Sequence, residues 1–200
     1  MGSKVVIVMC QLTNADATRA LGRWLAQRLL ERLAAASAAE DSATPAPPPL
    51  LLLLQGELGA GKTCLVQGLA EGLGISEPIT SPTFALAHHY AGHIEVVQPV
   101  PTPASPIAST TEQPTLRLRT ALVHLDLYRL EDAAAAVELF AQEEEEAQAL
   151  NAVLAVEWPE RLGFVPEPCW RVELEMAGEG RLARLVGAGL SDAIPPLPAP

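Results

Sequence analysis

Aromatic, basic and cysteine residues are all scarce in this sequence. Phe, Trp and Tyr make up 4% of its 200 residues while hydrophobic residues make up 49%, so Leu, Ala and Val must build the core. The 13 Lys and Arg residues against 24 Asp and Glu residues give a formal net charge of -11. This balance argues against a protein that grips a nucleic-acid backbone by itself, because such proteins usually present a basic face. The three cysteines, Cys10, Cys64 and Cys169, are far apart and without CxxC spacing, which predicts neither a disulfide framework nor a zinc site.

Long apolar runs are also missing. The run Leu50–Leu54 is far too short to span a bilayer. The apolar stretch near the N-terminus is too brief for the core of a signal peptide. These absences predict a soluble cytoplasmic protein that does not enter a membrane.

The chain length fits a single domain with a sizeable core, which we expect over residues 1–190. Within it, the Ala/Pro/Ser-rich segment 34–49 is typical of a linker loop, and the Pro/Thr-rich segment 93–115 is typical of a low-complexity surface insertion. The Pro-rich segment 191–200 is expected to be a disordered tail.

Apolar periodicity predicts alternating strands and helices. Helical spacing or propensity favours helices over 13–33, 61–73 and 131–150. Unbroken or alternating apolar segments predict strands over 5–9, 51–55, 83–90, 120–126 and 152–158, and a terminal β-hairpin formed by 169–176 and 181–187.

The stretch GELGAGKT, Gly56–Thr63, is the most informative motif. It satisfies the Walker A spacing G-x-x-x-x-G-K-T and lies between a predicted buried strand and a predicted helix, as the motif requires. Glycines let successive backbone N–H groups turn towards phosphate oxygens, and the N-terminus of the following helix favours the same anion. Lys62 can reach the β- and γ-phosphates, and the Thr63 hydroxyl can bind magnesium. The motif therefore predicts a bound nucleoside triphosphate, against the alternative of a glycine-rich turn that carries a lysine by chance.

Two predicted buried strands each end in a carboxylate. The segment ALVHLD ends in Asp126, and AVLAVE ends in Glu157. Ligands of open α/β sheets sit at the carboxyl ends of the strands. Either residue alone could simply cap a turn, but both together beside a phosphate loop favour a role in holding the metal or handling the attacking water.

Four motifs follow one another along the chain: GELGAGKT, SPTF, HLDLYRL and VEWPERL. They stand in the same order as in the bacterial TsaE family, which the chain resembles over most of residues 10–190. The resemblance implies a P-loop NTPase-like α/β fold, a three-layer sandwich with a mixed, partly antiparallel sheet. It also implies a slow Mg²⁺-dependent ATPase. Such an ATPase acts within the complex that forms the threonylcarbamoyl modification on adenosine 37 of tRNAs reading codons that start with A. The implied partners are the TsaB–TsaD protein pair, and tRNA is met only indirectly through them.

The resemblance also implies roles for individual residues. Thr63 and Glu157 would hold magnesium, and Lys62 and Asp126 would be catalytic, with Asp126 either orienting water or supporting the metal from the outer shell. Trp158 would lie beside the nucleotide. The residues expected to wrap the phosphates are Gly59, Ala60, Gly61, Lys62, Thr63 and Cys64, and those expected to form a switch-like loop facing them are Ser81, Pro82 and Thr83.

Two other functions share the phosphate loop. A small-molecule or nucleotide kinase of this size usually carries an arginine-rich lid, whereas the arginines after the loop are few and scattered. A nucleotide-gated binding module with negligible hydrolysis is the second alternative.

Several conspicuous residues have ordinary structural interpretations. Adjacent His88 and His89 are expected on opposite faces of a strand, without a spaced acidic partner, which favours surface histidines over a metal site. The run Glu143–Glu146 is expected to be a solvated helix face. Trp158 and Trp170 are each more typical of core or edge packing than of a base-stacking platform.

Overall fold

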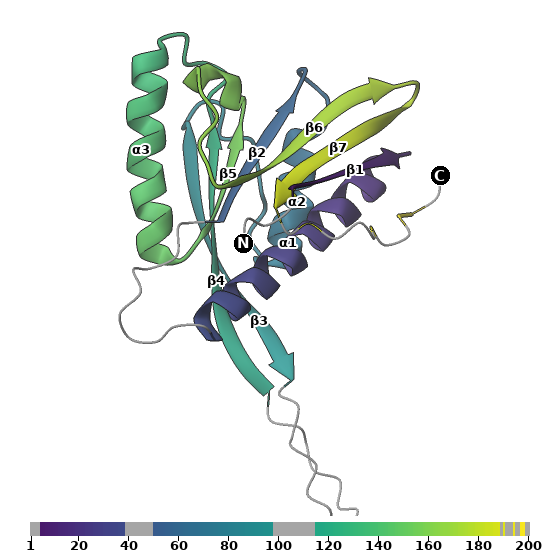
Figure 1. Cartoon of the computed structure of the whole chain (residues 1–200), viewed down its shortest axis with the longest axis vertical. Coiled ribbons are helices and arrows are strands. Elements are labelled where there is room, and N and C mark those ends of the chain that lie inside the picture. The colour runs from purple at the N-terminus through teal and green to yellow at the C-terminus, as the bar shows by residue number, and fades with distance from the viewer. Residues whose placement is uncertain are drawn as a thin grey trace, which may run out of the picture.

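The computed structural model describes residues 5–38, 50–97 and 115–188, together with 190, 194, 197 and 198. Within these residues the chain forms one seven-stranded sheet flanked by helices (Figure 1). The elements in chain order are β1 (Val5–Leu12), α1 (Ala15–Ala38), β2 (Leu50–Gly56), α2 (Lys62–Gly72), β3 (Ala87–Val97), β4 (Thr115–Asp126), α3 (Ala133–Leu150), β5 (Val153–Glu157), the 3-10 helix η1 (Pro159–Leu162), β6 (Cys169–Ala177) and β7 (Gly180–Ala188).

The sheet mixes parallel and antiparallel pairing. Its strand order is β1-β7-β6-β2-β5-β4-β3, in which β6, β2, β5 and β4 are parallel neighbours while β1, β7 and β3 join by antiparallel ladders. Glu157 pairs with Leu54 on one side and with Asp126 on the other, so the carboxyl ends of the three central strands meet at one edge. The predicted mixed, partly antiparallel α/β class is confirmed.

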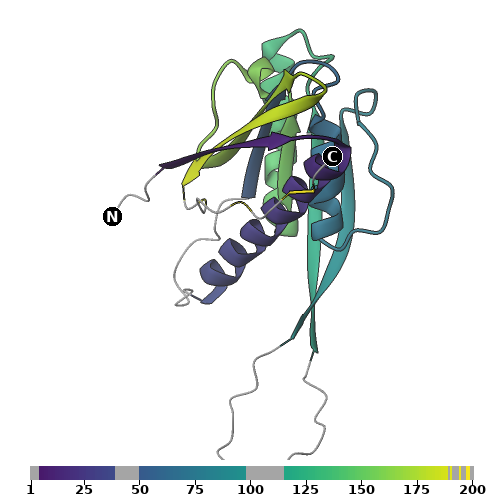
Figure 2. The same ribbon diagram turned by 90° about the vertical axis from the view of Figure 1, so that its right-hand side faces the viewer.

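Helices cover both faces of the sheet, which makes three layers. The helices α1 and α2 lie on one face, and α3 lies on the other (Figures 1 and 2). The alternation of side chains along a strand divides the leucines of β2 between the two cores: Leu52 and Leu54 face α1 and α2, whereas Leu51 and Leu53 face α3. Because β2 is buried on both faces, an unbroken leucine run is the pattern that it requires.

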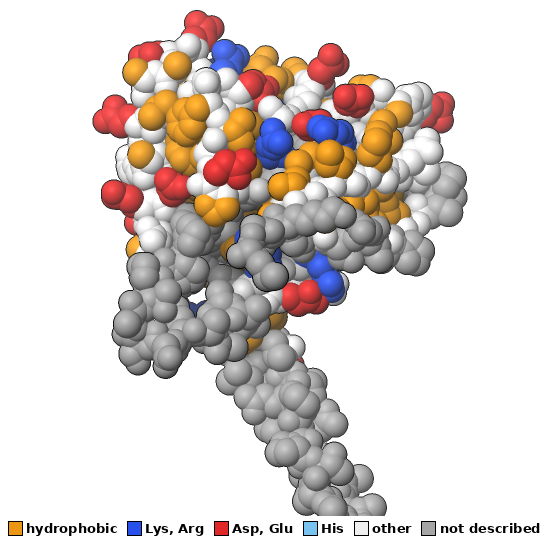
Figure 3. Space-filling model, viewed as in Figure 1, with side chains coloured by type: hydrophobic (Ala, Val, Ile, Leu, Met, Phe, Trp, Pro, Cys, Tyr) orange, Lys and Arg blue, Asp and Glu red, His pale blue; other side chains and the backbone are white. Residues whose placement is uncertain are grey.

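The inward face of α3 includes one glutamate of the acidic run, which corrects the expectation of a fully solvated Glu143–Glu146. Glu143 is 6% exposed, and its Oε2 lies 2.6 Å from Nε2 of His89 on β3. The buried positions of α3 are Ala136, Phe140, Glu143 and Ala147. Four consecutive helical residues span a full turn, so one of them must face the sheet. The view in Figure 3 shows acidic side chains around α3.

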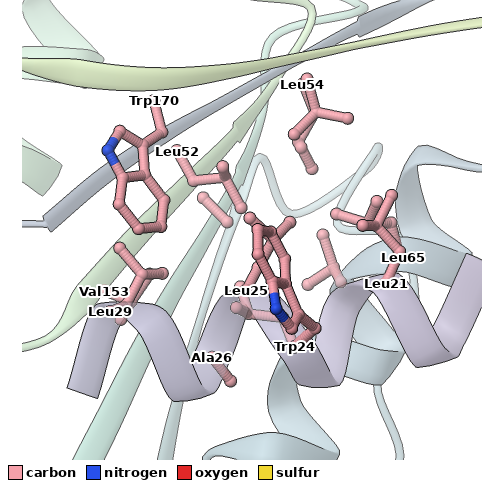
Figure 4. Packing of buried hydrophobic residues seen from close by; sticks show 14 of the residues in the cluster. Leu21, Trp24, Leu25, Ala26, Leu29, Leu52, Leu54, Leu65, Val153 and Trp170 are labelled. Carbon is pink, nitrogen blue, oxygen red and sulfur yellow. The ribbon is translucent and has the colours of Figure 1, made fainter. Parts of the chain in front are cut away.

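The first helical layer packs closely on the sheet and on itself. Figure 4 shows Trp24, Leu25 and Leu29 of α1 facing Leu52 of β2 and Trp170 of β6. Between the two helices, glycines allow a close approach: a Cβ built on Gly68 would overlap the Arg19 carbonyl, and one on Gly22 would overlap the Leu65 carbonyl. This crossing fixes α2, and therefore the loop before it, against the rest of the domain.

The predicted segment boundaries need correction. Helix α1 runs to Ala38, into the expected linker 34–49, and residues 39–49 lie outside the described residues. Strand β3 continues to Val97 and β4 begins at Thr115, so pairing occupies both ends of the expected insertion 93–115, of which 98–114 are not described.

The expected tail 191–200 is described only at residues 194, 197 and 198. Ile194 and Leu197 pack against the α1-side core, and Thr13 Oγ1 donates a hydrogen bond of 3.2 Å to the Pro198 carbonyl. None of the described helices combines the length and the apolarity that crossing a lipid bilayer requires.

Candidate nucleotide-binding site

A cavity of about 410 Å³ opens where the central strands end. Four segments that are distant in sequence line it: the phosphate loop, the SPTF loop, the end of β4 and the end of β5. Of the residues predicted to wrap the phosphates, Ala60 is fully buried within the loop and does not line the cavity. The cavity residues are Leu58, Gly59, Gly61, Lys62, Thr63, Cys64, Ser81, Thr83, Asp126, Tyr128, Glu157 and Trp158.

The phosphate loop has a backbone that only glycine adopts readily. Gly59 and Gly61 have φ values of 80° and 105°, in the left-handed region. Helix α2 begins at Lys62, directly after Gly61, which is its N-cap residue and makes no side-chain cap. The first N–H groups of α2 therefore point towards the cavity, which makes this helix end a favourable place for an anion.

Lys62 is held at the base of the loop. Its side chain is 4% exposed, and Nζ donates hydrogen bonds to the carbonyls of Gly56 at 2.6 Å and Glu57 at 2.9 Å. Nζ also lies 3.9 Å from the centroid of the Trp158 ring. Burial lowers the pKa of Lys62, against the opposing influence of nearby carboxylates, of which Glu157 is the strongest. The ammonium group of Lys62 is therefore already partly desolvated at the cavity wall.

A chain of three hydrogen-bonded side chains runs from the cavity wall into the core. Thr63 Oγ1 donates a hydrogen bond of 2.8 Å to Glu157 Oε1, and Nε2 of His124 lies 2.9 Å from the same oxygen. Glu157 is 3% exposed and His124 is fully buried. The sequence interpretation did not single out His124. The available signal was its position two residues before Asp126, which places both side chains on one face of β4.

The chemistry of these groups fits a magnesium ion. Mg²⁺ prefers oxygen ligands and usually takes only one or two from the protein, with phosphates and water completing the set. Thr63 uses its hydroxyl proton towards Glu157, which leaves the lone pairs of its oxygen for a cation. Among the residues that the structure describes, no group of three or more His, Cys, Asp or Glu side chains could hold a metal. A magnesium ion here would therefore depend on phosphate oxygens as further ligands.

Asp126 ties the SPTF loop to the sheet. Its Oδ2 accepts hydrogen bonds from Ser81 Oγ at 3.0 Å and Thr83 Oγ1 at 2.6 Å, and its Oδ1 accepts one from the Tyr128 backbone at 3.0 Å. The predicted switch residues Ser81 and Thr83 thus face the cavity, whereas Pro82 between them is buried. Movement of this loop would change the surroundings of a carboxylate in the site.

Trp158 follows Glu157 in a backbone conformation that is rare for residues other than glycine. Its φ of 60° and ψ of 46° are left-handed, a state that costs of the order of 1–3 kcal/mol. The ring packs at 4.8 Å from the Tyr128 ring, measured between centroids. Trp158 lines the cavity, whereas Trp170 is a core residue with 1% exposure.

Arg181 reaches the phosphate loop from the terminal hairpin. Its Nε donates to the Ala60 carbonyl and its Nη2 to the Gly59 carbonyl, both at 3.2 Å. The contacts fix the loop from a position more than a hundred residues away in the chain, so no local pattern could have indicated them.

Cys64 lies beside the loop on the α1 side. Its Sγ is 3.5 Å from the Ala15 carbonyl and 4.0 Å from Nη1 of Arg19. Burial raises the pKa of this thiol. The contacts give Cys64 a packing role between α1 and α2 at the edge of the cavity.

The chain was compared with known proteins. The family model described as "Threonylcarbamoyl adenosine biosynthesis protein TsaE" matches residues 12–184. A protein of Nostoc sp. named tRNA threonylcarbamoyladenosine biosynthesis protein TsaE is 38% identical over 127 residues, covering 64% of this chain and 63% of the relative, slightly less than two thirds of its length. A protein of Treponema pallidum with the same name is 36% identical over 128 residues, covering 64% of this chain and 73% of the relative.

A solved structure has the same fold. The crystal structure of YdiB from Bacillus subtilis superposes with a TM-score of 0.54 at 21% sequence identity. The match covers 94% of this chain and 90% of the other.

Proposed function

Because this chain belongs to the TsaE family of threonylcarbamoyl adenosine biosynthesis proteins, we propose that it is an ATP-binding and ATP-hydrolysing accessory protein of tRNA modification. The observation that carries the proposal is the meeting of Lys62, the Thr63–Glu157 pair and Asp126 around one cavity at the ends of parallel strands. Each group matches one requirement of phosphoryl transfer: charge on the phosphates, a metal site and a water-handling carboxylate.

The phosphate chain of ATP would lie along the loop between Gly59 and Thr63. Backbone N–H groups of the loop and of the first turn of α2 would donate to its oxygens. Lys62 would exchange its carbonyl partners for phosphate oxygens, a short movement for a side chain that already borders the cavity. Thr63 and Glu157 would hold the Mg²⁺ ion, which supplies positive charge to the phosphates when bound.

We propose that Asp126 orients the attacking water. Its three hydrogen bonds use three of about four acceptor sites of a carboxylate, and the remaining one can accept from a water molecule. Within the described part of the chain no arginine lines the cavity. Positioning by a single carboxylate without such an arginine supports slow hydrolysis by the isolated protein.

The partners that we propose are the TsaB–TsaD pair, with tRNA bound through them. The net charge of -11 opposes direct contact with a polyanion. The SPTF loop supplies a way to link nucleotide state to partner affinity, because a γ-phosphate near Asp126 would compete for Ser81 and Thr83.

The experiment measures phosphate release by the purified full chain with ATP and Mg²⁺, alone and with the TsaB–TsaD pair. We expect slow release alone and association with the pair that depends on nucleotide. A screen of small molecules and nucleotides for phosphorylated products separates this function from a kinase. Phosphate transfer to such an acceptor would contradict the proposal, as would equal affinity for the pair with ATP, with ADP and without nucleotide.

A further inference from the structure

His124 places a polar imidazole ring at a core position that an apolar side chain such as leucine could occupy. It lies on β4 with no exposed surface, facing the α1 and α2 side of the sheet, and its same-face neighbour Leu122 belongs to that core. Burying a polar ring without full hydrogen bonding is unfavourable. Nδ1 of His124 nevertheless has no hydrogen-bond partner among the residues that the structure describes. The cost suggests that the other nitrogen has a task that an apolar side chain could not perform.

The other nitrogen contacts one carboxylate oxygen. Nε2 of His124 lies 2.9 Å from Glu157 Oε1, the oxygen that also accepts from Thr63. A carboxylate oxygen only accepts, so the imidazole proton lies on Nε2. Two donors, one on β4 and one on α2, hold Oε1 in place. A carboxylate with a single donor would be free to turn about its last torsion.

We propose that His124 is a positioning residue for Glu157, which it holds in the orientation that the metal site requires. The inference rests on the proposed function, since it concerns the metal ligand of that same site. Residues that hydrogen-bond to metal ligands orient them, and their loss typically costs about 10- to 100-fold in metal affinity or activity. His124 acts only through Glu157 and does not itself line the cavity.

The test compares three substitutions in the full chain. His124→Leu removes the donor and keeps the bulk, and His124→Gln retains an N–H group at a comparable reach. The matched control is His88→Leu, because His88 lies directly opposite His124 in the β3–β4 ladder but bonds to Tyr90 instead. Trp158 fluorescence reports ADP binding without Mg²⁺ and ATP binding across a Mg²⁺ titration, and thermal melting reports folding.

We expect His124→Leu to bind ADP without Mg²⁺ as the parent does, and to need about 10- to 100-fold more Mg²⁺ for half-maximal ATP binding. His124→Gln should recover most of this loss, and His88→Leu should show none. If His124→Leu does not fold, His124→Asn replaces it, since its amide is too short to reach Glu157.

Equal Mg²⁺ requirements in the parent and in the variant without the donor would overturn the inference. An equal loss in the Gln and Leu variants would also overturn it, because a donor would then not matter. A parent that binds no nucleotide overturns the proposed function and this inference with it, whereas normal binding with an unchanged Mg²⁺ requirement overturns the inference alone.

Discussion

Thr83 Oγ1 donates a hydrogen bond of 2.6 Å to Asp126 Oδ2 and so joins the SPTF loop to the end of β4 across 43 residues of sequence. Ser81 makes a second, longer bond to the same oxygen. The loop and the proposed water-handling carboxylate therefore form one unit, and a substitution in either should change the position of the other.

Thr83→Val should separate hydrolysis from binding. The substitution keeps the branched shape and removes the shorter of the two hydroxyl donors to Asp126, so the carboxylate is held less firmly by its remaining bonds to Ser81 and the Tyr128 backbone. A hydrogen bond to a charged group contributes about 1.5 kcal/mol, so hydrolysis should fall about tenfold while ATP affinity changes little. Thr120→Val is the matched control, because its hydroxyl donates to the Leu73 carbonyl away from the cavity. A parallel loss of ATP affinity and hydrolysis in Thr83→Val would show that the contact supports binding instead.

Lys62→Ala should reduce ATP hydrolysis by about 10²–10³-fold, because it removes a preorganised charge aimed at the transferring phosphoryl group. The sequence offers a clean control, since its only other lysine is Lys4. Lys4→Ala should hydrolyse ATP at the parental rate. Hydrolysis by Lys62→Ala at the parental rate would contradict the assignment of the phosphate loop.

Gly68→Ala should destabilise the domain by about 1–3 kcal/mol, because the added methyl group must push α2 away from the Arg19 carbonyl. Glu71→Ala, one turn further along the same helix, should cost less than about 1 kcal/mol, since its ion pair with Arg23 is exposed. Chemical denaturation measures both free energies of unfolding. Equal values for the two variants would mean that the helices do not pack as closely as described.

The thiol of Cys10 should make stability depend on pH. Burial raises its pKa from 9.0 to about 11. Between these values the unfolded chain loses the proton that the folded chain keeps, so the contribution of Cys10 to stability is present below pH 9 and is lost as the pH rises through 11. The difference in melting temperature between the parent and Cys10→Ala should therefore shrink over this range. A constant difference would show that the thiol titrates alike in both states.

Local patterns predicted the parts of the site that are local in sequence. The phosphate loop could be predicted because the motif requires glycine, lysine and threonine at fixed spacing between a strand and a helix. Asp126 and Glu157 were found because each ends an apolar run, and parallel strands bring such ends together. The mixed class of the sheet came from the family resemblance, and the observed strand order agrees with it.

The residues that sequence reasoning missed act across long separations. His124 and Glu157 are 33 positions apart, and Arg181 and Ala60 are 121 positions apart, so neither contact has a periodic signature. The burial of Glu143 was not predicted because a run of four glutamates is typical of a solvent-exposed helix face. Only the packing of the helix on the sheet determines which of the four residues faces inward. Strand ends were misplaced at 93–97 and 115, because these residues were grouped with the Pro/Thr-rich sequence between them although Ile94, Val96 and Val97 favour strand structure.

The central claim is that this cavity binds ATP with Mg²⁺ through Lys62, Thr63 and Glu157. Isothermal titration calorimetry of ATP into the full chain, with Mg²⁺ and again with a chelator, tests it most directly. We predict one ATP bound per chain, with an affinity that falls when Mg²⁺ is removed and that becomes nearly independent of Mg²⁺ in Glu157→Gln. Binding of ATP with the same Mg²⁺ dependence in the parent and in Glu157→Gln, or no binding of ATP by the folded parent, would contradict the account.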